Sequence, residues 1–136
     1  LEIVCDADPA LLSCYIPKIL LQPILENCFS HGFRDVEHVC RITVGVQAEG
    51  DALRLSVADN GCGMDETTLR ELLARLQEPV PPGEHGIGLC NVNERLQLYF
   101  GAESRLSIES RSNSGTRISF RIPAIRDADA LRWYRR

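Results

Sequence analysis

Apolar residues recur at helical spacing over the segment from Ile16 to His31. They stand four residues apart in two neighbouring series, namely Ile16, Leu20, Ile24 and Cys28, and Leu21, Leu25 and Phe29. This pattern predicts an amphipathic helix. Gly32 is expected to be the residue just past its end, and Pro23 is expected to kink the helix or restart it.

Two more segments are typical of helices. Residues 89–100 predict a strong helix that Gly101 closes, and residues 65–77 predict a helix with acidic residues in its first turn, where they favour the helix dipole. A short helical turn is predicted at 11–15.

Alternation of apolar and polar residues indicates the strands. It is clearest over 53–58, where Leu53, Leu55 and Val57 alternate with shorter or polar residues, as in a strand with one buried face. Residues 39–48 alternate as well, and a turn at Gly50 joins the two strands into a predicted hairpin. Further strands are expected over 1–8, 105–111 and 116–122.

The predicted order is β, α, β, β, a loop containing a helix, α, β, β. Strands that occur in runs favour a mixed sheet over a strictly parallel one. We therefore expect an α/β fold of the α+β type, a two-layer sandwich with helices on one face of a mixed sheet.

Composition limits the function classes. A chain of 136 residues fits one domain, and 44% apolar with 25% charged residues is ordinary for a globular protein. The net charge of −4, with no block of like charges, argues against a nucleic-acid or anionic-membrane surface.

The six cysteines form neither a C-x-x-C pair nor a cluster with zinc spacing. They fall in apolar segments, so reduced core thiols in a cytosolic domain are the preferred interpretation and a disulfide framework is the alternative. There is no apolar stretch of membrane-spanning length. The chain starts with Leu1 and its only Met is Met64, so we expect it to be part of a longer protein that could carry a membrane anchor.

Four segments are candidates for holding a nucleotide. On the first helix Asn27 shares a polar face with Ser30 and His31. An Asn carbonyl oxygen suits Mg²⁺ that bridges phosphates. A solvated polar face is the alternative interpretation of the same pattern.

The second segment is the glycine-containing stretch 59–64. Asp59 at the end of a buried strand can accept a hydrogen bond from the exocyclic amine of adenine, whereas guanine would present a carbonyl there, so the site would favour ATP over GTP. Gly61 and Gly63 let the backbone pass close to a base. A plain Asp-Asn-Gly turn is the alternative.

The third segment, 83–89, is a glycine loop that leads into a helix N-terminus, which is an anion site by virtue of its free N–H groups. It is neither a Walker A loop nor a dinucleotide fingerprint, and a flexible connector is the alternative. In the fourth, Gly115 and Thr116 open the last strand. The Thr116 hydroxyl could bond to the base or to a water held by Asp59, or the pair could be only a turn.

Taken together and in this order, the four segments resemble the histidine-kinase branch of the superfamily that also contains gyrase B and MutL-type ATPases. Residues 21–27 look like its N box, 59–64 like its G1 box, and 86–92 with the following Glu-Arg-Leu like its G2 box. Gly115 and Thr116, leading to Ile122 and Pro123, resemble its closing strand. The residues of these motifs are most similar to those of LytS/YesM-like sensor kinases. The resemblance spans nearly the whole chain to Pro123 and implies a Bergerat-type fold.

The resemblance implies that Asn27 binds Mg²⁺ and that Asp59 reads adenine. It assigns ATP contacts to Asn27, His31, Asp59, Gly61, Gly63, Met64, Gly86, Ile87, Gly88, Leu89 and Thr116. Residues 66–85 would be the ATP lid.

Two departures from the family pattern matter. Pro23 stands where hydrolysing relatives have a Glu that activates water, which favours phosphoryl transfer over hydrolysis, with Glu26 as a candidate catalytic assistant beside Asn27. Ser30 stands where many histidine kinases have a Lys. The phosphate charge must then be met by Mg²⁺, by backbone amides of 86–88, and by a side chain that we leave open among His31, Arg34 and Arg75.

The leading hypothesis is a kinase domain that passes the γ-phosphoryl group of ATP to a histidine on a separate domain, for relay to a response regulator. None of the chain's three histidines has the context of an acceptor helix, so the isolated domain should bind ATP without phosphorylating itself. We expect a monomeric domain within a dimeric kinase. An anti-sigma-factor-type serine kinase and a degenerate nucleotide-binding interaction module are the alternatives.

For domain organisation we predict one ATP-binding domain over 1–123 and a tail over 124–136, which is a frayed terminus or a docking segment. The expected location is the cytoplasmic side of a membrane-anchored sensor protein.

Overall fold

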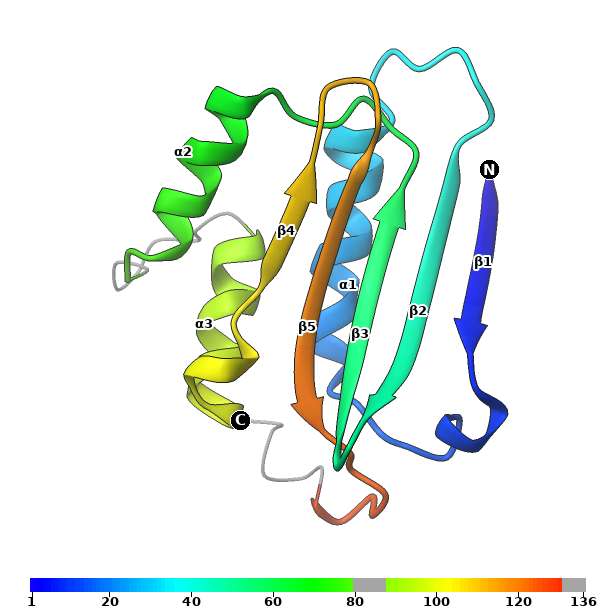
Figure 1. The fold of residues 1–136 in the computed structure, drawn as a ribbon, viewed down its shortest axis with the longest axis vertical. Helices are drawn as coiled ribbons and strands as arrows, with labels where there is room; N and C mark the ends of the chain where they lie inside the picture. The colour runs from blue at the N-terminus through cyan, green and yellow to red at the C-terminus, as the bar shows by residue number, and fades with distance from the viewer. Residues whose placement is uncertain (80–87, 131–136) are drawn as a thin grey trace.

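The computed structural model describes residues 1–79 and 88–130 (Figure 1). Its strands are β1 (Glu2–Ala7), β2 (Arg41–Glu49), β3 (Ala52–Asp59), β4 (Ser107–Ser110) and β5 (Thr116–Pro123). Its helices are α1 (Lys18–Asn27), α2 (Glu66–Leu76) and α3 (Gly88–Phe100), with short 3-10 turns at Pro9–Leu11 and Ala102–Ser104 and a π-helical turn at Cys28–Gly32.

The strands form one mixed sheet in the order β1-β2-β3-β5-β4. β1 runs parallel to β2, and the remaining neighbours are antiparallel. The mixed sheet predicted from the sequence is therefore confirmed, as is the β2–β3 hairpin. Its turn includes Gly50 at φ 59°, a backbone conformation that glycine adopts without steric cost.

Helices α1 and α3 cover one face of this sheet, and the other face is open to solvent (Figure 1). The alternation in β3 explains this asymmetry, because Leu53, Leu55 and Val57 are almost fully buried while Arg54 and Ser56 are only half-buried. The two-layer sandwich expected from the pattern is confirmed.

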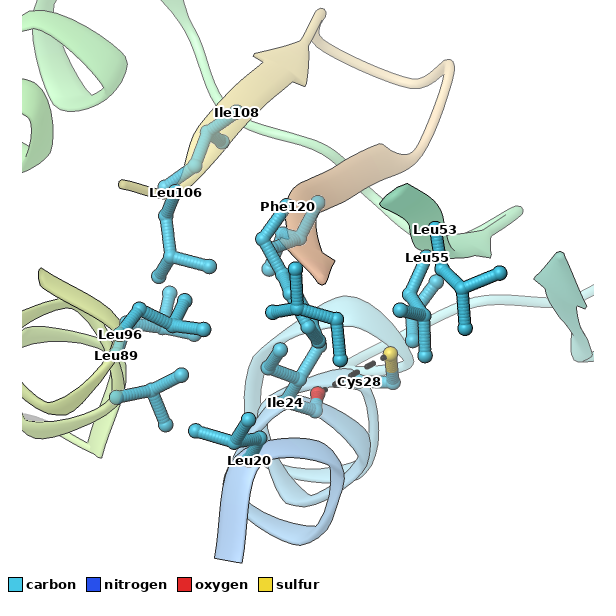
Figure 2. Close-up of a cluster of buried hydrophobic side chains, with 14 of the residues drawn as sticks. Leu20, Ile24, Cys28, Leu53, Leu55, Leu89, Leu96, Leu106, Ile108 and Phe120 are labelled. Atoms are coloured by element: carbon cyan, nitrogen blue, oxygen red, sulfur yellow. Dashed lines mark hydrogen bonds between the residues drawn. The ribbon is translucent and has the colours of Figure 1, made fainter. Parts of the chain in front are cut away.

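The core lies between the helices and the central strands. Figure 2 shows Leu20 and Ile24 of α1 and Leu96 of α3 around Phe120 of β5, and these four side chains are at most 1% exposed. Burying one such side chain stabilises a fold by about 1.5–3 kcal/mol. Both helices are therefore fixed firmly on the sheet.

The first helix begins at Lys18, after the predicted start at Ile16. Pro17 precedes the first helical residue, and the helix continues through Pro23 without restarting. It then widens into the π-helical turn, whose last residue is Gly32. The prediction that Gly32 is the residue just past the helix end was wrong, since Gly32 is the last residue of this turn and its φ is not positive. Gly32 instead packs closely against Asp59, because a Cβ there would lie 3.1 Å from the Asp59 carboxylate.

Helix α2 lies at the β4 edge of the molecule, less deeply packed than the other two helices (Figure 1). None of its residues is fully buried, although Leu69, Leu72 and Leu76 pack against the core. Its N-terminus is capped by Asp65, whose carboxylate accepts a hydrogen bond from the Thr68 amide at 2.7 Å. This bond lowers the pKa of the Asp65 carboxyl from its usual value.

The segment after β5 remains attached to the body of the domain. The Ala124 amide donates to the Asp51 carbonyl, and Ile125 forms a bridge with Tyr15 and is 6% exposed. The boundary after Pro123 stays a prediction, and residues 131–136 of the predicted tail lie outside the described residues. No helix within 1–79 and 88–130 is long and apolar enough to cross a membrane.

Candidate functional site

A cavity of about 340 Å³ opens where the C-terminal end of α1, the end of β3 and the face of α2 meet. It is the kind of concave space in which small ligands bind. Of the described residues, those that line it are Asn27, His31, Gly32, Asp59, Gly63, Met64, Thr68, Glu71, Leu72, Arg75, Leu89 and Thr116.

Asp59 is the charged group set deepest in this cavity. It is the last residue of β3 and is 9% exposed. The Gly61 amide donates to its Oδ1 at 2.8 Å, and a buried carboxylate is stable only with such partners. Thr116 is its cross-strand partner on β5 and also lines the cavity. Two of the residues predicted to contact a base therefore lie side by side.

The loop after Asp59 is held on both sides by backbone hydrogen bonds. The Cys62 amide donates to the Gly32 carbonyl at 2.7 Å, and the Asn113 amide donates to the Cys62 carbonyl at 2.7 Å. The loop thus bridges the end of α1 and the β4–β5 turn. A Cβ on Gly61 would overlap the Gly32 carbonyl oxygen, so this close approach requires glycine.

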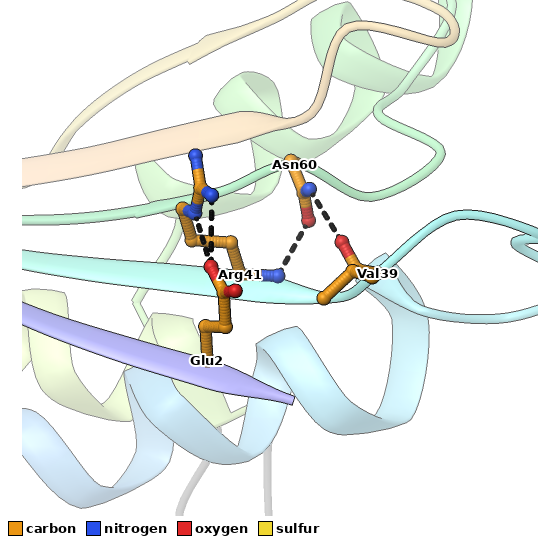
Figure 3. A network of polar contacts seen from close by, with 4 residues as sticks. All are labelled: Glu2, Val39, Arg41 and Asn60. Atoms are coloured by element: carbon orange, nitrogen blue, oxygen red, sulfur yellow. Dashed lines mark hydrogen bonds and ion pairs between the residues drawn. The ribbon is translucent and has the colours of Figure 1, made fainter.

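The side chain of Asn60 holds the start of β2 in place, a role that the sequence motif did not reveal. Its Oδ1 accepts from the Arg41 amide at 2.7 Å and its Nδ2 donates to the Val39 carbonyl at 2.8 Å (Figure 3). The Arg41 guanidinium in turn pairs with Glu2 of β1 at 2.8 Å. Asn60 therefore faces the start of β2 and does not line the cavity, while the adjacent Asp59 does.

The α1 side of the cavity is formed by Asn27 and His31, as the sequence predicted. No hydrogen bond to the Asn27 side-chain amide comes from residues 1–79 or 88–130, so its oxygen is available to a ligand. Glu26, its predicted assistant, lies outside the cavity and is exposed. It accepts a hydrogen bond from Gln22 at 3.1 Å, one turn earlier on the helix.

Helix α2 supplies a wall that the motifs did not identify. Thr68, Glu71, Leu72 and Arg75 face the cavity at the i, i+3, i+4 and i+7 spacing of one helical side. This spacing was visible in the sequence, but nothing local indicated which side would face a ligand. Of the three side chains left open for the phosphates, His31 and Arg75 line the cavity, whereas exposed Arg34 bonds to the Ser30 carbonyl.

Cys28 lies directly under this site. It is 2% exposed, and its thiol donates to the Ile24 carbonyl at 3.6 Å (Figure 2). Burial raises the pKa of the Cys28 thiol to about 12, and the nearby Asp59 carboxylate adds to this rise. The thiol is therefore neutral at physiological pH and adds no second negative charge beside Asp59.

The glycine loop before α3 is described only in part. Gly86 and Ile87 lie outside the described residues, and so does most of the predicted lid beyond residue 79. Gly88 is the first residue of α3, where a Cβ would lie 3.5 Å from the ring of Pro23. Leu89 is 2% exposed and borders the cavity.

This geometry can be compared with known proteins. Residues 17–126 match the family model described as histidine kinase-, DNA gyrase B- and HSP90-like ATPase. The chain belongs to this ATPase family. The resemblance stated from the four sequence motifs is thereby confirmed, and the chain is an ATP-binding domain of the histidine-kinase type.

Among curated relatives of this ATPase domain, Sensor protein LytS of Bacillus subtilis is 35% identical over 123 residues, and Sensor histidine kinase YesM of the same organism is 34% identical over 123 residues. Each match covers 90% of this chain and 20% of the relative. The chain therefore spans about a fifth of the length of these sensor proteins.

Solved structures show the same fold. The catalytic domain of histidine kinase ThkA superposes with a TM-score of 0.59 at 16% identity, covering 93% of this chain and 81% of that one. The histidine kinase domain from the blue-light activated kinase EL346 of Erythrobacter litoralis gives 0.59 at 19% identity, covering 90% and 51%. The expected Bergerat-type architecture is confirmed.

Proposed function

We propose that the cavity binds ATP together with Mg²⁺, and that the domain passes the γ-phosphoryl group to a histidine on a separate domain of a two-component sensor kinase. The observation that carries this proposal is that one cavity is lined by the cross-strand pair Asp59 and Thr116 and also by Asn27 and His31 from the end of the first helix and its π-helical turn. The strand pair suits a base, and the residues from the helix suit phosphates.

Base recognition rests on Asp59. One of its oxygens already accepts the Gly61 amide, and the carboxylate remains on the cavity lining. A carboxylate accepts hydrogen bonds and donates none, so it fits the exocyclic amine of adenine and opposes the carbonyl of guanine. This supports ATP over GTP as the ligand.

The donor set near Asn27 fits Mg²⁺ only when phosphate is present. Asn27 offers one neutral oxygen, and the described part of the chain has no group of three His, Cys, Asp or Glu residues able to hold a metal alone. Mg²⁺ keeps several waters and commonly bridges phosphate oxygens, and there it would neutralise charge on the transferred group. His31 and Arg75 would meet the remaining charge.

Transfer is favoured over hydrolysis by the side chains that α1 presents. Pro23, at the position where hydrolysing relatives have Glu, packs toward Gly88 and carries no titratable group. Glu26 is exposed and is not on the cavity lining. Helix α1 therefore places no carboxylate on this lining, which supports positioning with charge neutralisation as the chemistry.

The further partners belong to this proposal. The relatives are sensor proteins several times longer, which supports a separate acceptor domain outside this chain. With it we propose a dimeric full-length kinase, a response regulator as the next acceptor, and a cytoplasmic position beneath a membrane-anchored sensor. The relatives are named as a sensor protein and a sensor histidine kinase, and these names favour the histidine-kinase proposal over the serine-kinase alternative.

The test is calorimetric titration of ATP and GTP into the chain with Mg²⁺, and with EDTA in its place. We expect saturable ATP binding, weaker GTP binding, and loss of at least about tenfold in ATP affinity for Asp59→Asn, because a charge-assisted hydrogen bond is lost. Asp51→Asn is the matched control, since Asp51 lies in the hairpin turn at the opposite end of β3. A folded wild-type chain that binds no ATP would refute the proposal.

A further inference from the structure

Ser110, the last residue of β4, joins three parts of the nucleotide site through one hydroxyl group. Its Oγ accepts a hydrogen bond from the Met64 amide at 2.8 Å and can donate to the Gly115 carbonyl at 3.0 Å. It also lies 2.8 Å from Oγ1 of Thr116. Met64 and Thr116 both line the cavity, but Ser110 does not.

The direction of the bond between the two hydroxyls follows from counting protons. A serine hydroxyl has one proton to donate and two lone pairs to accept with. The Met64 amide can only donate and the Gly115 carbonyl can only accept. All three contacts of Ser110 are satisfied together only when its proton goes to Gly115 and Thr116 donates its own proton to Ser110.

The opposite direction would leave the half-buried network incomplete. If Ser110 donated to Thr116, the Gly115 carbonyl would lose this bond and one lone pair of Ser110 would be idle. Gly115 is buried, and an unpaired buried carbonyl costs free energy. The first arrangement is therefore the stable one.

This arrangement decides what Thr116 shows to a ligand. Its only proton is used toward Ser110, so Oγ1 presents lone pairs alone to the cavity. The neighbouring Asp59 carboxylate is also an acceptor. The wall formed by this cross-strand pair thus accepts hydrogen bonds at two adjacent points and donates none.

We propose that Ser110 is a positioning residue that fixes the Thr116 hydroxyl as an acceptor and so selects a purine with an amino group, rather than an oxo group, at position 6. The inference rests on the proposed function, namely that the base of ATP binds at Asp59 and Thr116. Ser110 itself acts only through Thr116, since it is not on the cavity lining.

The experiment compares the affinities of ATP and inosine triphosphate for the chain, because inosine triphosphate carries an oxo group in place of the amine. In Ser110→Ala the Thr116 proton is released and can be donated to the oxo group. The ratio of inosine triphosphate Kd to ATP Kd is then expected to fall by about fivefold, the size of one ordinary hydrogen bond. Ser110→Thr keeps the hydroxyl and should keep the wild-type ratio.

A second background separates recognition from simple support of the loop. In Thr116→Val there is no hydroxyl to direct, so adding Ser110→Ala should leave the ratio of that variant unchanged. If Ser110→Ala weakens both nucleotides equally, or changes the ratio even without the Thr116 hydroxyl, the proposal is wrong. No ATP binding by the wild-type chain would overturn the proposed function and this inference together, whereas ATP binding with an unchanged ratio would overturn this inference alone.

Discussion

Glycines let segments that are distant in the sequence touch beneath the cavity. A Cβ on Gly61 would overlap the carbonyl of Gly32, and one on Gly115 would overlap the carbonyl of Asp59. In both places backbone lies directly against backbone, so no neighbouring side chain can move aside. At the residue scale, the position of Asp59 therefore depends on glycines at 61 and 115, which have no Cβ.

Gly115→Ala should destabilise the domain far more than Gly50→Ala. Both glycines have positive φ, 79° and 59°, so the backbone strain is similar, about 1–2 kcal/mol. Only Gly115 would also place its Cβ against backbone, whereas Gly50 has open space around it. We expect a total loss of about 3–5 kcal/mol at Gly115, measured by urea unfolding. Equal losses would show that φ, and not the contact, is what requires glycine there.

At the scale of elements, one buried side chain connects α2 to the rest of the fold. Asn93 of α3 is 4% exposed, donates from Nδ2 to the Leu76 carbonyl at 2.9 Å and accepts at Oδ1 from the Leu106 amide at 2.8 Å. It thereby joins the last residue of α2 to the chain entering β4. Since α2 has no fully buried residue, this polar link adds to the packing of its leucines against the core.

Asn93→Ala should loosen α2 and lower the stability of the whole domain. It leaves the Leu76 carbonyl and the Leu106 amide without this partner, a cost of about 2–4 kcal/mol. Gln97→Ala is the control one turn later on α3, because within residues 1–79 and 88–130 its amide bonds only to the backbone carbonyl of Asn93 in the same helix. Amide hydrogen exchange should show faster exchange in α2 and at Leu106 for Asn93→Ala alone. Unchanged exchange in both variants would mean that apolar packing alone holds α2.

For the whole molecule, the positions of the histidines separate nucleotide binding from phosphate acceptance. His31 lies in the π-helical turn on the cavity lining, and His38 lies in the loop before β2, where its Nε2 is 2.5 Å from the Asn60 carbonyl oxygen. Neither histidine lies on a separate helix that could dock against the cavity and present an imidazole to bound ATP. The third histidine, His85, lies outside the described residues.

The isolated chain should therefore bind ATP but not become phosphorylated on histidine. The measurement is acid-labile, base-stable label on the chain after incubation with γ-labelled ATP and Mg²⁺, with the longer sensor kinase of the proposal as the positive control. EDTA should abolish labelling of that control. Labelled phosphohistidine on the isolated chain would place the acceptor inside this domain.

Much of the fold could be predicted because local pattern reflects local structure. Period-two alternation gave the β2–β3 hairpin, and period-four repetition gave α1, since an element with one buried face must repeat its apolar residues at its own period. The ends of the strands and helices were predicted less closely. The strand predicted over 105–111 is only Ser107–Ser110, because Asn93 takes the Leu106 amide and the turn begins at Arg111.

The sequence by itself determined the elements and their mixed-sheet class, because alternation and periodicity are local properties, and the resemblance of its motifs to a known family named Asn27, Asp59 and Thr116 as one site. Tertiary structure alone decided the strand order that inserts β5 between β3 and β4, the outward position of Glu26 and the side of α2 that faces the cavity. It also decided the link from Ser110 to Thr116 and Met64. These depend on contacts between distant segments, whose geometry is set by packing of the whole core and by which hydrogen bonds remain to be satisfied.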